Sequence, residues 1–384
     1  MNSKKKLHIA VVGLGFGFDF VPLYLHHPDV TRVTVSDANP ALMKRVADQF
    51  GVERRAASLT DILNDDDIDA VHLLTSVPQH VEHTIAVLQA GKHCACAVPM
   101  ASSIDGLHSV LDAWKKSGKA YMGMETAVYT NRFQYVADMR DKGELGAIQF
   151  LSGQYFQDTE NYAKYWDGMP PMQYVTHIVA PLLALPKTRA KAVYCLGSGV
   201  MRDELVRNYG NPFPIETAMF ELDSPTPLVA QINRTMFHTA RTYQETFNVY
   251  GEKTSFEWEQ IEEEQPIVYR WIARAERGSD RHGSEISLER LDVPDYGARV
   301  PAEIARFTRY GYYDEAHPET SFKMGGGHDG SHPHMAHEFI RSIIEDRQPT
   351  LDAITTANWN APGICAHESA MNGGARVIVP QFDA

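Results

Sequence analysis

Apolar and polar positions follow two rhythms over the first third of the chain. Five short apolar runs have the length and the residue types of buried strands: LHIAVV, RVTVS, AVHLLT, HCACAV and AYMGME. The segments between them have helical spacing and cover residues 18–26, 41–50, 79–90 and 103–117. Strands that alternate with helices predict a parallel sheet with helical crossovers, so the predicted fold class is α/β.

The remainder of the chain has a different pattern. Beyond residue 185 strand-like runs dominate, and TFNVYGEKTSFEW reads as a hairpin around Gly251. Helical segments are expected again near 335–346 and 356–372. Because 384 residues exceed what one ordinary core accommodates, we expect two domains.

Net charge and hydropathy argue against nucleic-acid and membrane partners. The formal net charge is −13, whereas nucleic-acid binders usually present a concentrated basic surface, so no nucleic-acid partner is expected. Lysines at 4–6 precede an apolar run, as in a signal peptide, but that run of about six residues is shorter than the roughly 7–15 required. No window approaches a membrane span of about 18 apolar residues, so no membrane partner is expected either.

The cysteines indicate a reducing compartment. There are four, at Cys94, Cys96, Cys195 and Cys365, too few and too scattered for a disulfide framework. A cytoplasmic location is therefore expected. Cys94 and Cys96 form a C-x-C pair in a strand, and core packing is favoured over zinc because no further soft ligands lie nearby.

The first strand is followed by the turn GLGFGFDF. Gly13 and Gly15 match the first two glycines of the dinucleotide fingerprint, while the third falls on Phe18, so either the helix is displaced or that ring points elsewhere. Asp37 ends the second strand about 22 residues beyond Gly15, where an acid accepts bonds from the adenosine ribose and favours NAD over NADP. The alternative is that Asp37 caps the next helix.

The stretch TSVPQHVEHTIAVLQAGKHCACAVPMA resembles the Gfo/Idh/MocA family, with His80 ahead of a Gly91-Lys92-His93 strand entry. The resemblance covers essentially the whole chain. It implies a Rossmann NAD-binding domain over 1–125 and an α+β domain over 126–384. The second domain would carry a large open, mainly antiparallel sheet, with C-terminal helices that pack back on the first. By analogy it also implies a homodimer or homotetramer.

Two family features are missing. The family's dehydrogenases have Glu-Lys-Pro beside the nicotinamide, where this chain has Ala97, Val98 and Pro99, and an aspartate four residues before the catalytic histidine, where Gln173 precedes His177. A branch of NAD-dependent glycoside hydrolases, the α-N-acetylgalactosaminidase type, also lacks both features. The chain is similar to that branch in AVPM, YVTH, METAVY, GQYFQD and GGGHDG.

The resemblance assigns roles to individual residues. The catalytic candidates are His177, Tyr174 and Tyr155; His177 suits the 3-hydroxyl proton because imidazole titrates near neutrality, and either tyrosine could be the C2 base. The sugar contacts expected are Gln157, Tyr162, Lys164, His328 and His332. The cofactor contacts expected are Gly13, Gly15, Phe16, Asp37, Thr75, His80, Ala97, Val98, Pro99, Glu125 and Thr126.

Each catalytic candidate also has a structural interpretation. His177 could be a hydrogen-bonded core residue, and Tyr155 could simply pack on its strand. The histidine-rich run from His328 to His337 could hold zinc, but it passes from a glycine loop into a helix, so its imidazoles should diverge and no metal is expected.

Three functions remain open. The first is a redox-neutral glycosidase that uses NAD for transient C3 oxidation, C2 deprotonation, elimination, water addition and re-reduction. The second is an NAD-dependent sugar or keto-sugar dehydrogenase or reductase. The third is a non-catalytic module that senses sugar and NAD. In each the ligand is a small carbohydrate or glycoside.

Overall fold

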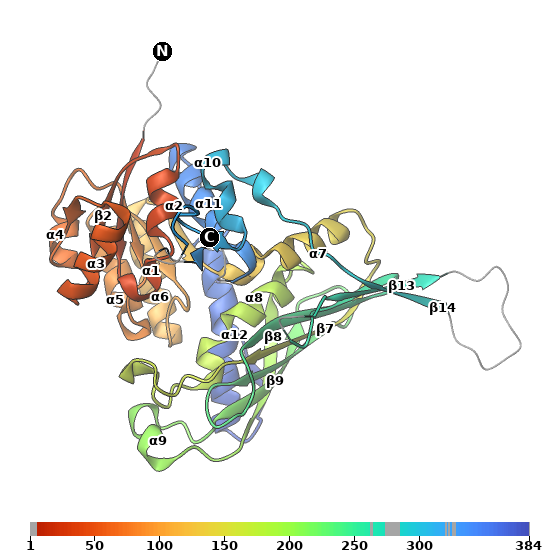
Figure 1. The fold of residues 1–384 in the computed structure, drawn as a ribbon. Coiled ribbons are helices and arrows are strands. Elements are labelled where there is room, and N and C mark those ends of the chain that lie inside the picture. Colours follow the sequence, from red (N-terminus) through yellow and green to blue (C-terminus); the bar gives the residue numbers. More distant parts are fainter. Residues whose placement is uncertain are drawn as a thin grey trace, which may run out of the picture. The chain divides into compact units, whose positions relative to one another are not determined.

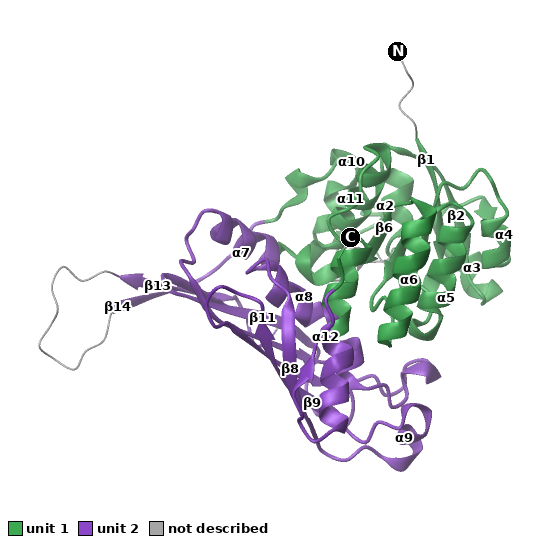
Figure 2. Ribbon diagram, turned by 180° about the vertical axis from the view of Figure 1, so that it is seen from behind, with its two compact units in different colours: residues 1–131, 295–361, 382–384 green, residues 132–294, 362–381 purple. Residues whose placement is uncertain are grey.

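The computed structural model describes residues 6–261, 264–272, 285–318, 321, 323–324 and 328–383. The chain divides into two compact units (Figure 2). Unit 1 comprises residues 1–131, 295–361 and 382–384, and unit 2 comprises residues 132–294 and 362–381. The chain thus returns to unit 1 after completing most of unit 2.

Unit 1 is built on a six-stranded parallel sheet with the order β3-β2-β1-β4-β5-β6 (Figure 1). Its strands are β1 (Leu7–Val12), β2 (Val30–Ser36), β3 (Arg54–Arg55), β4 (Ala70–Leu73), β5 (His93–Ala97) and β6 (Tyr121–Met124). Every residue of β1 is buried, as expected for a central strand covered on both faces. The strand order reverses between β1 and β4, which is the arrangement of a Rossmann fold, so the predicted α/β class is confirmed.

The helices of unit 1 cover this sheet. They are α1 (Leu14–Gly17), α2 (Val21–His26), α3 (Pro40–Phe50), α4 (Leu59–Leu63), α5 (His80–Gln89), α6 (Ile104–Ser117), α10 (Ala302–Ala305), α11 (His332–Ile344) and the first half of α12 (Ala353–Met371). Short 3-10 turns are η1 (Val77–Gln79), η2 (Thr126–Val128), η5 (Gly297–Arg299), η6 (Arg306–Thr308) and η7 (His328–Gly330), and β15 (Gly311–Tyr312) pairs with β16 (Lys323–Met324).

The ends of α6 illustrate why these helices begin and end where they do. The hydroxyl of Ser103 accepts a hydrogen bond from the backbone N–H of Gly106, which satisfies one of the free donors of the first turn. At the other end Gly118 adopts a left-handed conformation with φ 64°, which ends the helix without a Cβ penalty.

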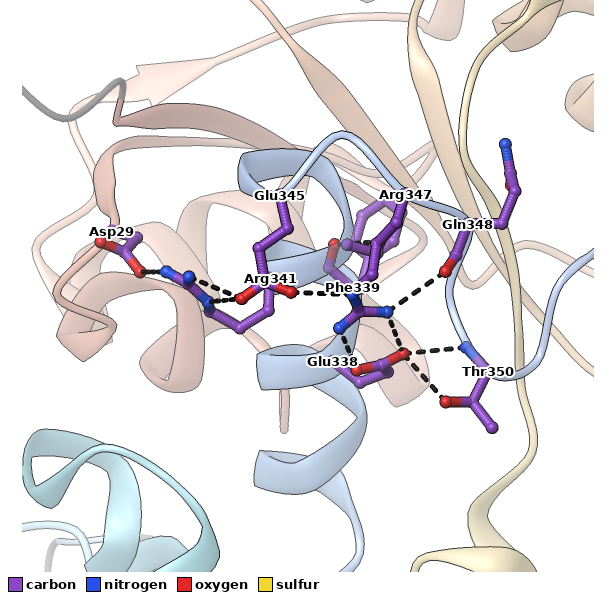
Figure 3. A network of polar contacts seen from close by, with 9 residues as sticks. Asp29, Glu338, Phe339, Arg341, Glu345, Arg347, Gln348 and Thr350 are labelled. Carbon is purple, nitrogen blue, oxygen red and sulfur yellow. Dashed lines mark hydrogen bonds and ion pairs between the residues drawn. The ribbon is translucent and has the colours of Figure 1, made fainter.

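Helix α11 is tied to its surroundings by a network of charges (Figure 3). Arg347 makes two parallel bonds to the carboxylate of Glu338, at 2.7 and 2.8 Å, and Glu338 also accepts from the backbone N–H of Thr350. Arg341 bridges Glu345 and Asp29, and Asp29 precedes β2. The network therefore joins α11 to the chain before β2 and to the loop that leads into α12.

Unit 2 contains a nine-stranded sheet with the order β14-β13-β12-β11-β7-β10-β9-β8-β17. The strands are β7 (Ile148–Phe156), β8 (Ala190–Ser198), β9 (Ile215–Leu222), β10 (Val229–Thr235), β11 (Gln244–Gly251), β12 (Thr254–Glu257), β13 (Ile267–Ile272), β14 (Glu285–Arg290) and β17 (Val377–Ile378). Among the strand pairs of this sheet in the described chain, β7 and β10 are parallel and the others are antiparallel. The expected hairpin around Gly251 is formed by β11 and β12.

Helix α8 (Thr176–Ala184) covers one face of this sheet. A Cβ at Gly153 of β7 would lie 2.0 Å from the Ile178 side chain, so glycine permits this close approach. The opposite face carries large apolar side chains that are about half exposed, namely Tyr194, Met219, Trp271, Ile286 and Leu288. The other helical elements of unit 2 are α7 (Asn131–Asp141), α9 (Asp203–Tyr209), η3 (Lys164–Trp166), η4 (Pro171–Tyr174) and the second half of α12.

No helix within the described parts of the chain combines the length and the apolar character that crossing a membrane requires.

Candidate functional site

The glycine turn after β1 fits a dinucleotide phosphate. Gly13 has φ 90°, and a Cβ there would lie 2.4 Å from the carbonyl oxygen of Leu74, so only glycine fits. Gly15 is exposed, and a Cβ there would meet nothing within 4 Å. The backbone at Gly15 is thus open to an approaching pyrophosphate at the start of α1.

The third position of the fingerprint is displaced by one residue. Gly17, not residue 18, packs closely against the sheet, because a Cβ at Gly17 would lie 3.0 Å from the side chain of Val11. The ring of Phe18 points elsewhere and packs 5.4 Å from that of Phe50. The bulky residue at 18 therefore does not block the turn.

Asp37 follows β2 and is engaged by the glycine turn. Its Oδ2 accepts from the backbone N–H of Leu14 and its Oδ1 from that of Asn39, both at 2.7 Å. Each carboxylate oxygen has a second lone pair, so Asp37 can still accept a bond from a ribose hydroxyl. The alternative that Asp37 caps the next helix is wrong, because the side chain of Asn39 caps α3.

The other expected cofactor residues lie at the carboxyl ends of β4, β5 and β6. Thr75 follows β4, residues 97–99 end and follow β5, and Glu125 and Thr126 follow β6. Carboxyl ends of parallel strands share one edge of a sheet, the edge at which such folds bind ligands. The ring nitrogens of His80 lie 2.7 Å from the carbonyl oxygen of Pro99 and 3.0 Å from that of Thr75, so its side chain joins two of these loops.

Two histidines expected at the sugar, His328 and His332, lie beside the glycine turn. The ring of Phe16 is 6.0 Å from that of His328 and 5.5 Å from that of His332, all within unit 1. Burial and the neighbouring His328 hold the pKa of His332 well below its usual range. Among the described residues, no group of three or more His, Cys, Asp or Glu side chains could hold a metal ion; residues 325–327 of the glycine loop lie outside the described chain.

Unit 2 contains a row of polar side chains across four neighbouring strands. Glu216 of β9 is opposite Arg234 of β10, Arg234 is opposite Tyr155 of β7, and Tyr155 is opposite Glu245 of β11. All four lie on the face that α8 covers, since they keep the alternation of Gly153.

Arg234 is the centre of this row and is fully buried. Its guanidinium carbon lies 3.6 Å from the centre of the ring of Tyr155. Its nitrogens donate to Oε1 of Gln157 at 2.8 Å and to the carbonyl oxygens of Tyr174 and Thr235 at 3.0 and 2.6 Å. None of these partners in the described chain is a carboxylate, and the rigid fork of donors explains how the cation is held by neutral oxygens.

The three expected catalytic side chains lie together. Nε2 of His177 is 3.4 Å from the hydroxyl oxygen of Tyr174, and the ring of Tyr155 packs edge-on against that of His177 at 5.7 Å. Burial raises the pKa of Tyr155 well above its usual value, the neighbouring Tyr174 adds to that rise, and Arg234 opposes it.

A second phenol lies next to Tyr155. The hydroxyl of Tyr243 donates to the carboxylate of Glu245 and also shares a hydrogen bond with Tyr155. Tyr155 is 1% exposed, whereas Tyr243 is 52% exposed. The three oxygens therefore form a chain from a buried phenol to a carboxylate.

The expected sugar contacts of unit 2 are divided. Gln157 belongs to the cluster, because its side chain holds Arg234. Tyr162 is half exposed and packs edge-on on Trp166, whose ring lies 4.7 Å from that of Tyr174. Lys164 is exposed in η3, and the structure does not bring it into the cluster.

Sequence reasoning missed Arg234, Tyr243, Glu216 and Glu245. A signal for Arg234 was present, since it continues the buried alternation of Ala230 and Ile232 in β10, where a charge is unusual. Glu216 offered no comparable signal. Its carboxylate is fully buried between the backbone N–H of Met172 and Nδ1 of His367, and both partners are distant in sequence.

Comparison with known proteins shows what this chain is similar to. Residues 7–124 match the family described as oxidoreductase family, NAD-binding Rossmann fold, Gfo/Idh/MocA. Glycosyl hydrolase family 109 protein 1 of Phocaeicola vulgatus is 22% identical over 98% of this chain and 84% of that protein. The levoglucosan dehydrogenase of Pseudarthrobacter phenanthrenivorans is 26% identical over 40% of this chain and 42% of that protein.

Solved structures show the same fold. A levoglucosan dehydrogenase in complex with NADH matches with a TM-score of 0.77 at 20% identity, over 98% of this chain and 100% of that one. An apo scyllo-inositol dehydrogenase from Lactobacillus casei matches with a TM-score of 0.71 at 15% identity, over 98% and 99%. Residues 7–124 therefore match the Gfo/Idh/MocA oxidoreductase family, and their parallel strands form an NAD-binding Rossmann fold.

Proposed function

We propose that this chain is an NAD-dependent, redox-neutral glycosidase that acts on a small carbohydrate glycoside. The observation that carries the proposal is the cluster of Tyr155, Tyr174 and His177 around the buried Arg234. Relatives named as glycosyl hydrolase family 109 proteins, aligned over nearly the whole chain, support it, as does Val98 at the position of the dehydrogenases' lysine.

The glycine turn, Asp37 and the loops after β4 to β6 would hold the cofactor. When bound, NAD accepts a hydride from C3 of the sugar and returns it at the end of the cycle. His177 would take the proton of the 3-hydroxyl group, because Tyr174 holds its ring and imidazole exchanges protons near neutral pH. The 3-ketone then acidifies the hydrogen at C2.

Tyr155 would remove the C2 proton as a phenolate. For this its own proton moves to Tyr243 while the proton of Tyr243 moves to the carboxylate of Glu245. Arg234 above the ring stabilises the negative charge, which a buried phenol otherwise disfavours. The C1–oxygen bond breaks as the C1–C2 double bond forms, and the leaving group departs as its anion. Water adds to C1 and gives its proton to that anion, while Tyr155 returns a proton to C2. His177 returns its proton to the C3 oxygen when the ketone is reduced again.

The test uses nitrophenyl glycosides in D2O with no added cofactor. Release of nitrophenol with deuterium at C2 of the released sugar supports the proposal. Tyr155→Phe should abolish both while leaving NADH formation at C3 measurable. Release without deuterium at C2 contradicts the elimination route.

A sugar or keto-sugar dehydrogenase is the second candidate. It is supported by relatives named as dehydrogenases and by the His177–Tyr174 pair, which can exchange the proton of an alcohol without a lysine. Stoichiometric NADH from free sugar and added NAD+, with no glycoside cleavage, would favour it.

We also propose a homodimer or homotetramer. The half-exposed side chains of Tyr194, Met219, Trp271, Ile286 and Leu288 share the sheet face opposite α8, and an apolar surface of this kind favours association. Light scattering of wild type and of Leu288→Lys tests this: the wild-type mass should be a multiple of 43.0 kDa and the variant's should be lower.

A further inference from the structure

His80 has an unusual hydrogen-bond environment. It begins α5 and is 1% exposed. Its Nδ1 lies 2.7 Å from the carbonyl oxygen of Pro99, and its Nε2 lies 3.0 Å from that of Thr75. Both ring nitrogens therefore face groups that only accept hydrogen bonds.

A neutral imidazole cannot satisfy both contacts. It carries one N–H, so its other nitrogen would turn a lone pair toward a carbonyl oxygen within hydrogen-bond distance. Turning the ring over would place carbon atoms at these positions, but C–H···O contacts lie at about 3.3–3.6 Å, longer than 2.7 and 3.0 Å. Only an imidazolium donates to both oxygens.

The surroundings support the charge. Burial by itself lowers the pKa of His80, whereas the neighbouring Cys96 side chain, which also hydrogen-bonds the ring, and the two carbonyl oxygens together raise it to about 9. Three residues on along α5, His83 differs: its Nδ1 contacts the hydroxyl of Thr75, and burial lowers its pKa. The pKa values of these two histidines of one helix are therefore shifted in opposite directions because their partners differ.

The position of His80 gives the charge a role. Thr75 and Pro99 follow β4 and β5, in the half of the Rossmann sheet opposite the one that holds Asp37. Since Asp37 suits the adenosine ribose, the β4–β6 half receives the nicotinamide end. The nicotinamide ring of NAD+ is positive and becomes neutral when it accepts a hydride, so a fixed cation in this half disfavours NAD+ relative to NADH.

We propose that His80 is a permanently protonated positioning residue that clamps the loops after β4 and β5 and makes the chain prefer NADH over NAD+. The proposal rests on the proposed function only in requiring a bound nicotinamide cofactor. In a redox-neutral cycle this preference would favour oxidation of the sugar at C3 and retention of the cofactor.

Neutron crystallography of the wild-type protein at pH 7.5 tests the charge directly. Deuterium on both Nδ1 and Nε2 of His80 is expected, and deuterium on one nitrogen alone overturns the proposal. This measurement needs no variant and no substrate.

Dissociation constants of NAD+ and NADH test the preference. His80→Gln should shift their ratio toward NAD+ by roughly three- to tenfold. The matched control His83→Gln should leave the ratio within twofold, because it removes a neutral imidazole from the same helix. An unchanged ratio in a folded His80→Gln protein contradicts the preference. Both readouts are independent of glycoside cleavage, so a failed glycosidase assay leaves them intact.

Discussion

The guanidinium of Arg234 stacks on the ring of Tyr155, with 3.6 Å between its central carbon and the ring centre. A phenol needs a nearby cation to act as a base, and this contact supplies one from within unit 2. It also makes Arg234 a positioning residue, because the same guanidinium holds Gln157 and the backbone of Tyr174.

Replacing Arg234 should separate charge from geometry. Arg234→Lys keeps a positive charge but loses the planar fork, so we expect kcat/KM to fall by about 10²-fold. Arg234→Met leaves buried carbonyl oxygens without donors and should also lower the free energy of unfolding by about 3 kcal/mol. Steady-state kinetics and chemical denaturation check both. Wild-type kinetics in Arg234→Lys would refute the positioning role.

Tyr243→Phe should slow the step at C2. The change removes the oxygen that links Tyr155 to Glu245, and we expect kcat to fall by about 10²-fold with little change in stability, since Tyr243 is half exposed. Tyr250→Phe is the matched control, because Tyr250 also donates to a glutamate, Glu257, but on the opposite sheet face. Equal losses in the two variants would count against the hydrogen-bonded chain.

The two glycines of the turn should respond differently to alanine. Gly13→Ala places a Cβ against the Leu74 carbonyl oxygen at a positive φ, so both the melting temperature and NAD affinity should fall. Gly15→Ala meets no protein atom, so the fold should survive while NAD affinity falls by at least tenfold. Calorimetry and fluorescence titration with NADH distinguish these outcomes, and full NAD affinity in Gly15→Ala would exclude a pyrophosphate at this turn.

Acid should destabilise unit 1 through its buried histidines. Burial lowers the pKa of His72 to about 3 and that of His334 to about 4. Between pH 6.5 and 4 the unfolded chain binds protons that these folded groups do not, so stability falls with falling pH, by up to about 1.4 kcal/mol per histidine and pH unit.

His72→Gln tests the sign of this effect. In the variant, the slope of the free energy of unfolding against pH, measured between pH 4 and 6.5, should be smaller by about 1.4 kcal/mol per pH unit, which corresponds to one proton. Below about pH 5.5 His80 does not contribute, because it is protonated there in both the folded and the unfolded states. An unchanged slope would show that His72 is already charged in the folded protein.

The network around α11 should contribute modestly to stability. Arg347→Lys keeps the charge but loses the paired bonds to Glu338, and we expect a loss of about 1 kcal/mol, because Arg347 is partly exposed. Arg309→Met, which removes a more exposed ion pair with Asp295, should change stability by less than about 0.5 kcal/mol. Denaturant titration compares the two. A larger loss of unfolding free energy in Arg309→Met than in Arg347→Lys would show that the paired bonds between Arg347 and Glu338 add no stability.

The architecture of unit 1 follows from patterns in the amino-acid sequence. Apolar runs that alternate with amphipathic segments predict a parallel sheet with helical crossovers. The G-x-G turn predicts the edge of the sheet at which a dinucleotide binds. These features are encoded within short windows, so periodicity and glycine spacing were enough to read them. Resemblance to a family then selected His177, Tyr174 and Tyr155, which the structure brings together.

The surroundings of these three side chains depend on how distant segments of the chain pack. The row of Glu216, Arg234, Tyr155 and Glu245 joins four strands whose pairing is set by register, and it includes a parallel pair that no local pattern predicts. The charge of His80 likewise depends on two carbonyl oxygens from loops 5 and 19 residues away. Protonation and stacking are properties of neighbours in space, and a one-dimensional pattern contains the residues but not their distances.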